Sequence, residues 1–212
     1  MKSRFQRNVL PVVCLAVLAA GIWVGTRLPF FVNNPPPTAN GIVFDNPQTI
    51  GPFRLIDQGQ RLFSTKNLLG HWSLVYFGFS HCGTPCADTL AELHRLSEQL
   101  AAEVQVLVQP IVVSVDPDCD TPERLAAFLA TISPRLIGIT GEKEQIRHLA
   151  AQLAAPFDIR AGPGDTYRVD HSNNILLVNP AGRFQAILTP PHDATRLAAD
   201  FSAIALWQQS KN

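Results

Sequence analysis

A strongly apolar stretch that runs into two cysteines constrains the fold of this chain more than any other feature. Residues 73–79 read Ser-Leu-Val-Tyr-Phe-Gly-Phe, and this density of aliphatic and aromatic side chains is typical of a buried strand. Cys82 and Cys86 follow directly, and leucines then recur with helical spacing at positions 90, 93, 96 and 100. The sequence therefore predicts a buried strand, a turn that carries both thiols, and a helix packed on the strand.

The place of the two thiols at a predicted helix start determines their chemistry. Unpaired backbone N–H groups and the helix dipole favour an anion there, so a cysteine ionises more readily than in a free peptide. If the helix begins near Cys82, the spacing of four puts Cys82 and Cys86 on one face, roughly 5–6 Å apart between β-carbons. Such a pair can form a redox-active disulfide, form an inert one, or hold one soft metal ion.

Composition places the chain among ordinary globular proteins. Its 212 residues are 46% hydrophobic, and 17 basic side chains balance 17 acidic ones. This length suits one domain with additional segments, and the net charge of zero argues against a nucleic acid partner. Four cysteines are too few for a scaffold built on disulfides, so we expect the core to depend on apolar packing.

The N-terminal segment has the pattern of a membrane anchor. Residues 1–8 carry three basic side chains, and 9–32 form an apolar run that includes Cys14 and is interrupted by the single charge of Arg27. Because about 17–25 apolar residues cross the hydrocarbon layer, we expect a cytoplasmic N-terminus at 1–8 and a transmembrane anchor at 9–32. The prediction is a single-pass protein of the inner (plasma) membrane, with its domain on the periplasmic or extracytoplasmic side. A cleaved secretory signal is the alternative.

The rest of the chain is expected to form a tether and one domain. Three consecutive prolines mark 33–46 as an extended tether, and 47–207 alternates predicted strands with predicted helices. This order predicts an α/β, thioredoxin-like domain: a mostly parallel central sheet with flanking helices, an N-terminal hairpin and a C-terminal antiparallel hairpin. Thr121, Thr140 and Asp193 are the expected helix caps.

His171 differs from the other histidines because it is predicted in a polar loop just before a buried strand. It follows Asp170, whose carboxylate could orient its second ring nitrogen. An imidazole beside two thiolates suits both Cu(I) and Cu(II), whereas zinc usually takes a fourth ligand. The local sequence alone leaves open whether His171 is a ligand or an ordinary loop residue. We expect the histidines at 71, 94 and 148 on the solvated surface, 81 turned away from the thiols, and 192 near a helix cap.

Three segments, in this order, resemble the Sco/SenC family of membrane-anchored copper chaperones. They are 77–86 with its C-x-x-x-C pair, 114–117 (Ser-Val-Asp-Pro) with 120–122 (Asp-Thr-Pro), and 167–172 with the pattern Tyr-x-Val-Asp-His-Ser. The resemblance implies a thioredoxin-like fold in which Cys82, Cys86 and His171 bind copper as Cu(I) and/or Cu(II). It also implies copper delivery to the binuclear copper site of cytochrome c oxidase.

The same resemblance implies three partners. They are the copper-bearing subunit of the oxidase, an upstream copper donor or thiol reductant, and the membrane through the N-terminal helix. Two departures from the family pattern stand out, because Gly83 and Ala87 occupy positions that are usually proline. Cys119 lies in a loop position that is more often charged; it is either an incidental free thiol or a third sulfur able to approach the pair.

A second hypothesis is an enzyme that exchanges thiols and disulfides. Cys82 would attack a disulfide of the copper-receiving partner, and Cys86 would resolve the mixed disulfide. The C-x-x-x-C spacing departs from the C-x-x-C of thiol oxidoreductases, which counts against this hypothesis. A peroxidase of the peroxiredoxin type is a third, weaker alternative that only the predicted fold suggests.

Overall fold

The computed structural model describes residues 15, 17–19, 23, 34–99, 108–161 and 167–211. The domain that carries the cysteines lies within residues 36–212. Its largest element is an eight-stranded sheet with the strand order β1-β10-β9-β4-β5-β6-β2-β3. The strands of this sheet are β1 (Gly41–Thr49), β2 (Arg54–Asp57), β3 (Leu62–Ser64), β4 (Trp72–Gly78), β5 (Val108–Ser114), β6 (Ile137–Thr140), β9 (Ile175–Val178) and β10 (Arg183–Leu188).

The sheet is mixed rather than mostly parallel. β4 pairs in parallel with β5, and β5 with β6, but β9 lies antiparallel on the other side of β4. The predicted hairpins are present as β2–β3 and β9–β10, and β1 adds a further antiparallel edge on β10. The thioredoxin-like α/β arrangement is thus confirmed in outline, whereas the mostly parallel sheet is not. β1 begins at Gly41, inside the range 33–46 expected to be tether.

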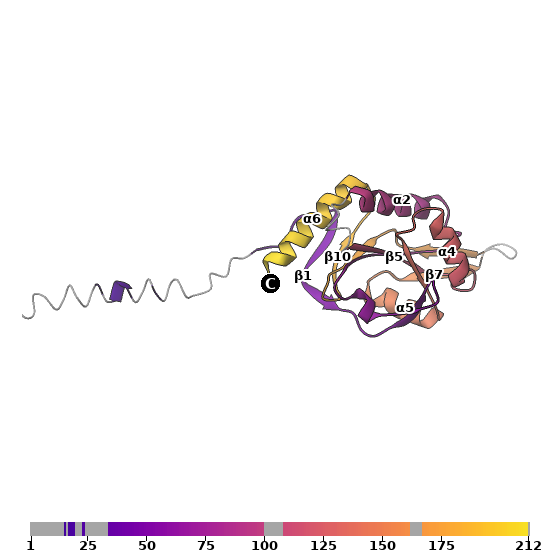
Figure 1. The fold of residues 1–212 in the computed structure, drawn as a ribbon, viewed down its shortest axis with the longest axis horizontal. Coiled ribbons are helices and arrows are strands. Elements are labelled where there is room, and N and C mark those ends of the chain that lie inside the picture. The colour runs from indigo at the N-terminus through magenta and orange to yellow at the C-terminus, as the bar shows by residue number, and fades with distance from the viewer. Residues whose placement is uncertain are drawn as a thin grey trace, which may run out of the picture. The chain divides into compact units, whose positions relative to one another are not determined.

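Helices cover both faces of the sheet, as Figure 1 shows with α2 and α6 along one side and α5 on the other. Alternate residues of β4 separate the two faces, because side chains alternate along a strand. Val75 and Phe77 join the core cluster that includes α5, whereas Leu74 and Tyr76 join the cluster that includes the other helices. The helices are α2 (Thr84–Gln99), α4 (Pro122–Ala130), α5 (Lys143–Gln152) and α6 (Ala194–Ser210), with a short 3₁₀ helix η1 (Thr65–Leu68).

Two of the three predicted helix caps are confirmed. Thr121 accepts a hydrogen bond from the backbone N–H of Arg124 at the start of α4, and Asp193 accepts one from Arg196 at the start of α6. The prediction for Thr140 is wrong, because Thr140 belongs to β6 and Glu142 precedes α5 as its cap. Strand β6 extends further than its apolar pattern indicated.

A two-stranded ribbon separates α5 from β9. It consists of β7 (Phe157–Ala161) and β8 (Tyr167–His171), which pair antiparallel in a sheet of their own. The sequence predicted a polar loop at 167–174, so His171 ends a strand instead of lying in a loop. The predicted flexible insertion at 161–165 falls almost entirely on 162–166, outside the described residues. After the ribbon, β9 enters the sheet antiparallel to β4.

The predicted membrane anchor is not supported. Among the described residues, no helix combines the length and the apolar character needed to cross a membrane. The prediction of a single-pass protein of the inner membrane is corrected accordingly. Most of the predicted span 9–32, and all of the predicted cytoplasmic segment 1–8, lies outside the described residues.

Candidate metal centre

The two cysteines occupy the turn between the central strand and the first long helix, as the sequence predicted. β4 ends at Gly78 and α2 begins at Thr84, so Cys82 lies in the turn and Cys86 in the first turn of the helix. They form a disulfide with a Cα–Cα distance of 5.8 Å. Cys86 is buried, with 1% of its surface exposed, whereas Cys82 is half-buried. Cys82 is therefore the more accessible sulfur.

A glycine at the end of β4 makes room for the buried sulfur. A Cβ added to Gly78 would lie 2.8 Å from Cε1 of Tyr76 and 3.6 Å from Sγ of Cys86. The first distance is well inside van der Waals contact, so any side chain would displace the Tyr76 ring. Glycine at this position lets the ring and the disulfide pack against the same strand end.

A buried carboxylate holds the turn that leads into Cys82. Asp120 is fully buried, and its Oδ2 accepts hydrogen bonds from the Ser80 backbone N–H at 3.0 Å and from Ser114 Oγ at 2.7 Å. The Ser80 hydroxyl donates to its other oxygen. The loop after β5 is thereby joined to the residue two positions before Cys82. This role was not predicted from the sequence, which indicates only that Asp120 lies in a loop before a helix; its burial, which requires such donors, depends on the tertiary structure.

His171 brings its ring to both sulfurs. Its Nε2 lies 3.1 Å from Sγ of Cys82 and 3.4 Å from Sγ of Cys86. The three possible ligand atoms lie within 4.8 Å of one another. Among the described residues, these three side chains form the group that could hold a metal ion. The rings of Tyr76 and Phe79 meet the imidazole edge-on, each 6.1 Å away between centroids. These contacts come from β4, its turn and the start of α2, 85 to 95 positions away along the chain.

The second ring nitrogen of His171 faces a backbone carbonyl instead of Asp170. Nδ1 lies 3.0 Å from the carbonyl oxygen of Ser172, so it donates there and leaves Nε2 with its lone pair towards the sulfurs. The Asp170 carboxylate lies 3.3 Å from Nε of Arg160 on the neighbouring strand. The structure does not bring Asp170 to the His171 ring, because adjacent residues of a strand point to opposite faces.

The loop that follows His171 is fixed at Asn173. Its side-chain oxygen accepts a hydrogen bond of 2.7 Å from the Tyr76 hydroxyl, and its carbonyl lies 2.6 Å from Nε2 of His192. Burial raises the pKa of Tyr76, so its hydroxyl remains a donor at neutral pH. Tyr76 was not predicted as a site residue, although a tyrosine in a fully buried strand needs a polar partner.

A cavity of about 540 Å³ opens beside Cys82, and Cys119 and Tyr167 line it together with His81 and Asp170. Cys119 is half-buried and not part of a disulfide, and it is not a member of the group formed by the pair and His171. Nδ1 of the exposed His81 lies 2.9 Å from the Ser80 hydroxyl. The cavity gives a partner molecule access to Cys82.

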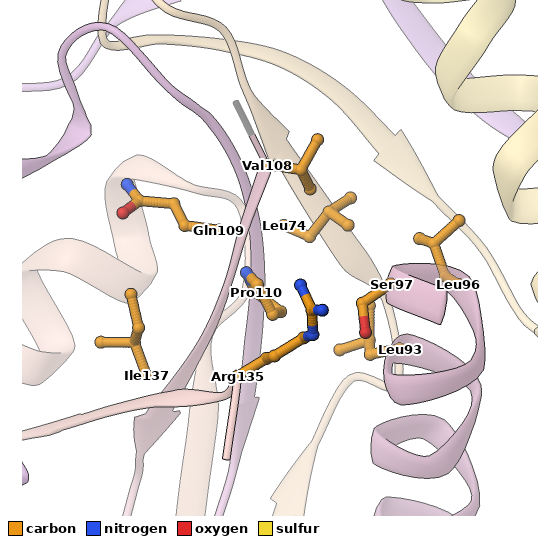
Figure 2. Close-up of a pocket in the computed structure, with 9 residues that line it drawn as sticks. All are labelled: Leu74, Leu93, Leu96, Ser97, Val108, Gln109, Pro110, Arg135 and Ile137. Atoms are coloured by element: carbon orange, nitrogen blue, oxygen red, sulfur yellow. The ribbon is translucent and has the colours of Figure 1, made fainter. Parts of the chain in front are cut away.

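A second pocket, shown in Figure 2, lies away from these groups. It measures about 210 Å³ and is mainly apolar, with Leu93 and Leu96 of α2 on one wall and Val108 and Ile137 on another. Val108 and Ile137 begin β5 and β6, so this pocket is at the amino ends of the parallel strands. The cysteine pair follows the carboxyl end of β4, where open α/β sheets usually place their sites.

Comparison with known proteins gives consistent matches. The family model described as SCO1/SenC matches residues 44–206. A protein of Stutzerimonas stutzeri is 35% identical over 72% of this chain and 75% of its own length. The crystal structure of yeast Sco1 with copper bound superposes with a TM-score of 0.69 at 30% identity, covering 78% of this chain and 96% of that one.

A further solved structure is that of BsSco, described as a member of the Sco family of cytochrome c oxidase assembly proteins with a disulfide switch. Its TM-score is 0.60 at 25% identity, and the match covers 77% of this chain and 97% of that one. The chain spans about half the length of the mitochondrial SCO proteins of yeast and Arabidopsis thaliana that it also matches, between 44% and 52%.

Proposed function

Because this chain belongs to the SCO1/SenC family, we propose that it binds copper through Cys82, Cys86 and His171 and delivers it to the copper-bearing subunit of cytochrome c oxidase. One observation carries the proposal: a single imidazole nitrogen lies 3.1 and 3.4 Å from the two sulfurs. Two relatives of similar fold, the Sco1 of yeast and the ScoI of Arabidopsis thaliana, have been solved with copper bound.

The donor set favours copper over harder ions. Thiolate sulfur selects soft ions such as Cu(I), and a neutral imidazole nitrogen suits both Cu(I) and Cu(II). Carboxylate oxygens, which magnesium or calcium would need, are absent from the group of candidate ligands among the described residues. The Nδ1–H of His171 points at the Ser172 carbonyl, which supports Nε2 as the nitrogen ligand.

Copper binding requires reduction of the Cys82–Cys86 disulfide. Two electrons and two protons convert the disulfide to two thiols, and the thiols lose their protons when they bind the ion. A thiol reductant must therefore act before loading, which agrees with the predicted upstream partner. Since protons compete with copper for both sulfurs and the imidazole, the affinity for copper should fall as the pH falls.

Unequal exposure of the ligands supports an order of ligand exchange. Cys82 and His171 are half-buried and Cys82 lines the cavity, whereas Cys86 is buried. A ligand of the recipient can approach from the side of Cys82 and His171, so we propose that these two bonds are exchanged first. Cys86 would hold the ion until the recipient has supplied two ligands.

The test uses the reduced 212-residue chain with Cys14 replaced by serine, because the Cys14 thiol, which is not a proposed ligand, would otherwise compete for copper. We expect one tightly bound copper per chain and transfer of the ion to a purified copper-binding domain of the oxidase subunit. Cys82→Ser, Cys86→Ser and His171→Ala should each weaken copper binding by roughly 10-fold or more, since each removes a ligand.

His148→Ala is the matched control. His148 lies on α5 and is exposed, so its loss should leave the copper stoichiometry unchanged. If His171→Ala behaves like His148→Ala in both stoichiometry and affinity, the three-ligand site is refuted.

The disulfide also supports a second function, that of a thiol-disulfide oxidoreductase. In the reduced form, the Cys82 thiolate would attack a disulfide of the partner and release one partner thiolate. Cys86 would then attack Cys82, release the second partner thiolate and restore the disulfide. The greater exposure of Cys82 favours it as the attacking sulfur.

Turnover of a disulfide substrate separates the two functions. An oxidoreductase would lose turnover in Cys82→Ser and retain it in His171→Ala, because the imidazole carries no electrons in the exchange. A copper carrier without this activity would show no turnover in any form, while copper transfer would depend on all three residues.

A further inference from the structure

One face of strand β8 meets the body of the domain at three points. Tyr167, Val169 and His171 alternate along the strand and therefore share a face. Val169 is partly buried against the core cluster beneath, and His171 reaches the sulfurs. Arg168 and Asp170 are exposed on the opposite face.

The ribbon depends on these contacts because it lacks pairing with the main sheet. β7 and β8 form a two-stranded sheet of their own among the described strands. An isolated two-stranded hairpin is at best marginally stable in water. The position of His171 is therefore determined by the points at which the ribbon is docked.

Tyr167 makes the docking contact furthest from the sulfurs. Its hydroxyl donates to Oδ2 of Asp116 and lies 3.3 Å from Sγ of Cys119. The position of Asp116 is fixed. Only 4% of its surface is exposed, and its backbone carbonyl accepts hydrogen bonds from the N–H groups of Cys119 and Asp120 at 3.2 and 2.9 Å.

The loop that receives Tyr167 also holds the cysteine turn. Asp116 and Asp120 are four positions apart in the segment between β5 and α4. Asp120 binds the backbone and hydroxyl of Ser80, two positions before Cys82, while Asp116 binds the end of β8 that is four positions from His171. One short loop thus contacts both segments that supply the candidate copper ligands.

We infer that Tyr167 is a positioning residue for His171, and that through Asp116 it registers the β7–β8 ribbon against the cysteine turn. The inference rests on the proposed copper site. Four residues of strand separate Tyr167 from His171, roughly 13 Å at ~3.3 Å per residue. Release of Tyr167 therefore lets its end of the ribbon move about the remaining attachments, which are Val169, Asn173 and, on β7, Phe157.

Loss of the Tyr167 contact should make the position of the His171 nitrogen ligand less well defined and leave both sulfur ligands in place. Tyr167→Phe removes one hydroxyl from a side chain that is 38% exposed, so it opens no cavity in the core. Copper affinity should fall roughly 10-fold, as for other residues that orient a ligand. His171→Ala should lose more, because it removes the ligand itself.

A metal-free measurement and a copper measurement on the 212-residue chain together test the inference. Without metal, proton NMR should show nuclear Overhauser contacts between the His171 ring and the β-protons of Cys86, weakened in Tyr167→Phe. With Cu(II), electron paramagnetic resonance should show nitrogen superhyperfine coupling that is weakened in the same variant. The thermal midpoint of each variant reports any general loss of stability.

Cys119→Ala is the matched control, because it removes the second neighbour of the Tyr167 hydroxyl and leaves Asp116 in place. It should behave like the unsubstituted chain in both measurements. Equal effects of Cys119→Ala and Tyr167→Phe would overturn the assignment to Asp116. Unchanged spectra in Tyr167→Phe would overturn the positioning role outright.

His171→Ala distinguishes these failures from failure of the copper site. If His171→Ala loses the nitrogen coupling while Tyr167→Phe keeps it at full strength, only the inference about Tyr167 fails. If His171→Ala keeps the nitrogen coupling, the proposed site itself fails, and the metal-free contacts remain as a separate measure of ribbon position.

Discussion

Asp120 is a fully buried carboxylate whose described partners are two hydroxyls and a backbone N–H group. Replacement by alanine would leave these donors without an acceptor. Because an unsatisfied buried polar group costs about 1–3 kcal/mol, Asp120→Ala should lower the free energy of unfolding by about 2–4 kcal/mol. Urea denaturation of the reduced and the oxidised chain measures this change.

Asp118→Ala provides the comparison for this prediction. Asp118 pairs with Lys143 at the surface, and 70% of its side chain is exposed, so its loss should change the free energy of unfolding by less than about 1 kcal/mol. Equal effects of the two substitutions would contradict the role assigned to Asp120.

The two sulfurs of the reduced chain should react at different rates. Cys82 is half-buried beside a cavity, and Cys86 is 1% exposed. Since alkylation needs access to the thiolate, Cys82 should react roughly 10-fold faster than Cys86 at neutral pH. Peptide mapping by mass spectrometry after timed alkylation gives both rates, and faster reaction at Cys86 would refute the proposed order of ligand exchange.

Among the elements, the β7–β8 ribbon should be the least protected strand pair near the site. Within the part of the chain that the structure describes, its strands pair only with each other, whereas β4 lies between two neighbours and is buried along its whole length. Segments with few buried contacts open at lower free energy than the core. Amide hydrogen exchange should therefore be faster at 157–161 and 167–171 than in β4, and equal protection would show that the ribbon is part of the core.

The sequence predicted the elements whose signals are local. The apolar run before Cys82, the leucine spacing of α2 and the caps Thr121 and Asp193 all indicated structures that are present. The β7–β8 ribbon was not predicted, because 167–171 is mostly polar or exposed. Strand β8 pairs with β7 and not with a strand of the main sheet among the described residues. A polar strand has no periodic signal that separates it from a loop.

For the molecule as a whole, the candidate ligands could be predicted from motifs, but the residues that hold those ligands in position could not. Cys82, Cys86 and His171 carry the chemistry by residue type, and the structure brings them together. The contacts of Asp120 with Ser80 and of Tyr167 with Asp116 join segments 40 and 51 positions apart. Neither contact has a sequence pattern, because tertiary packing alone decides which hydroxyl meets which carboxylate.

Global stability should depend on pH through His192. Its Nε2 donates to the Asn173 carbonyl, and its Nδ1 is buried and has no hydrogen-bond partner among the described residues. Burial lowers the pKa of His192 from the ordinary 6.5. The unfolded chain therefore binds a proton more readily than the folded one. This contribution to stability is complete above about pH 6.5 and is lost as the pH falls towards the lower pKa of the folded state.

Urea denaturation between pH 7.5 and pH 5 measures this dependence (roughly the window set by the unfolded pKa). His192→Gln, which can still donate to the Asn173 carbonyl, should flatten the decline, whereas the exposed control His148→Ala should leave it unchanged. A steeper decline in His192→Gln would contradict the assignment to His192.

The most direct test of the central claim is X-ray absorption at the copper edge of the loaded, reduced chain, beside its His171→Ala variant. The account predicts scattering from the sulfurs of Cys82 and Cys86 and from one imidazole nitrogen, with the nitrogen contribution lost in the variant. An identical spectrum for both proteins would contradict the claim that His171 completes the copper site.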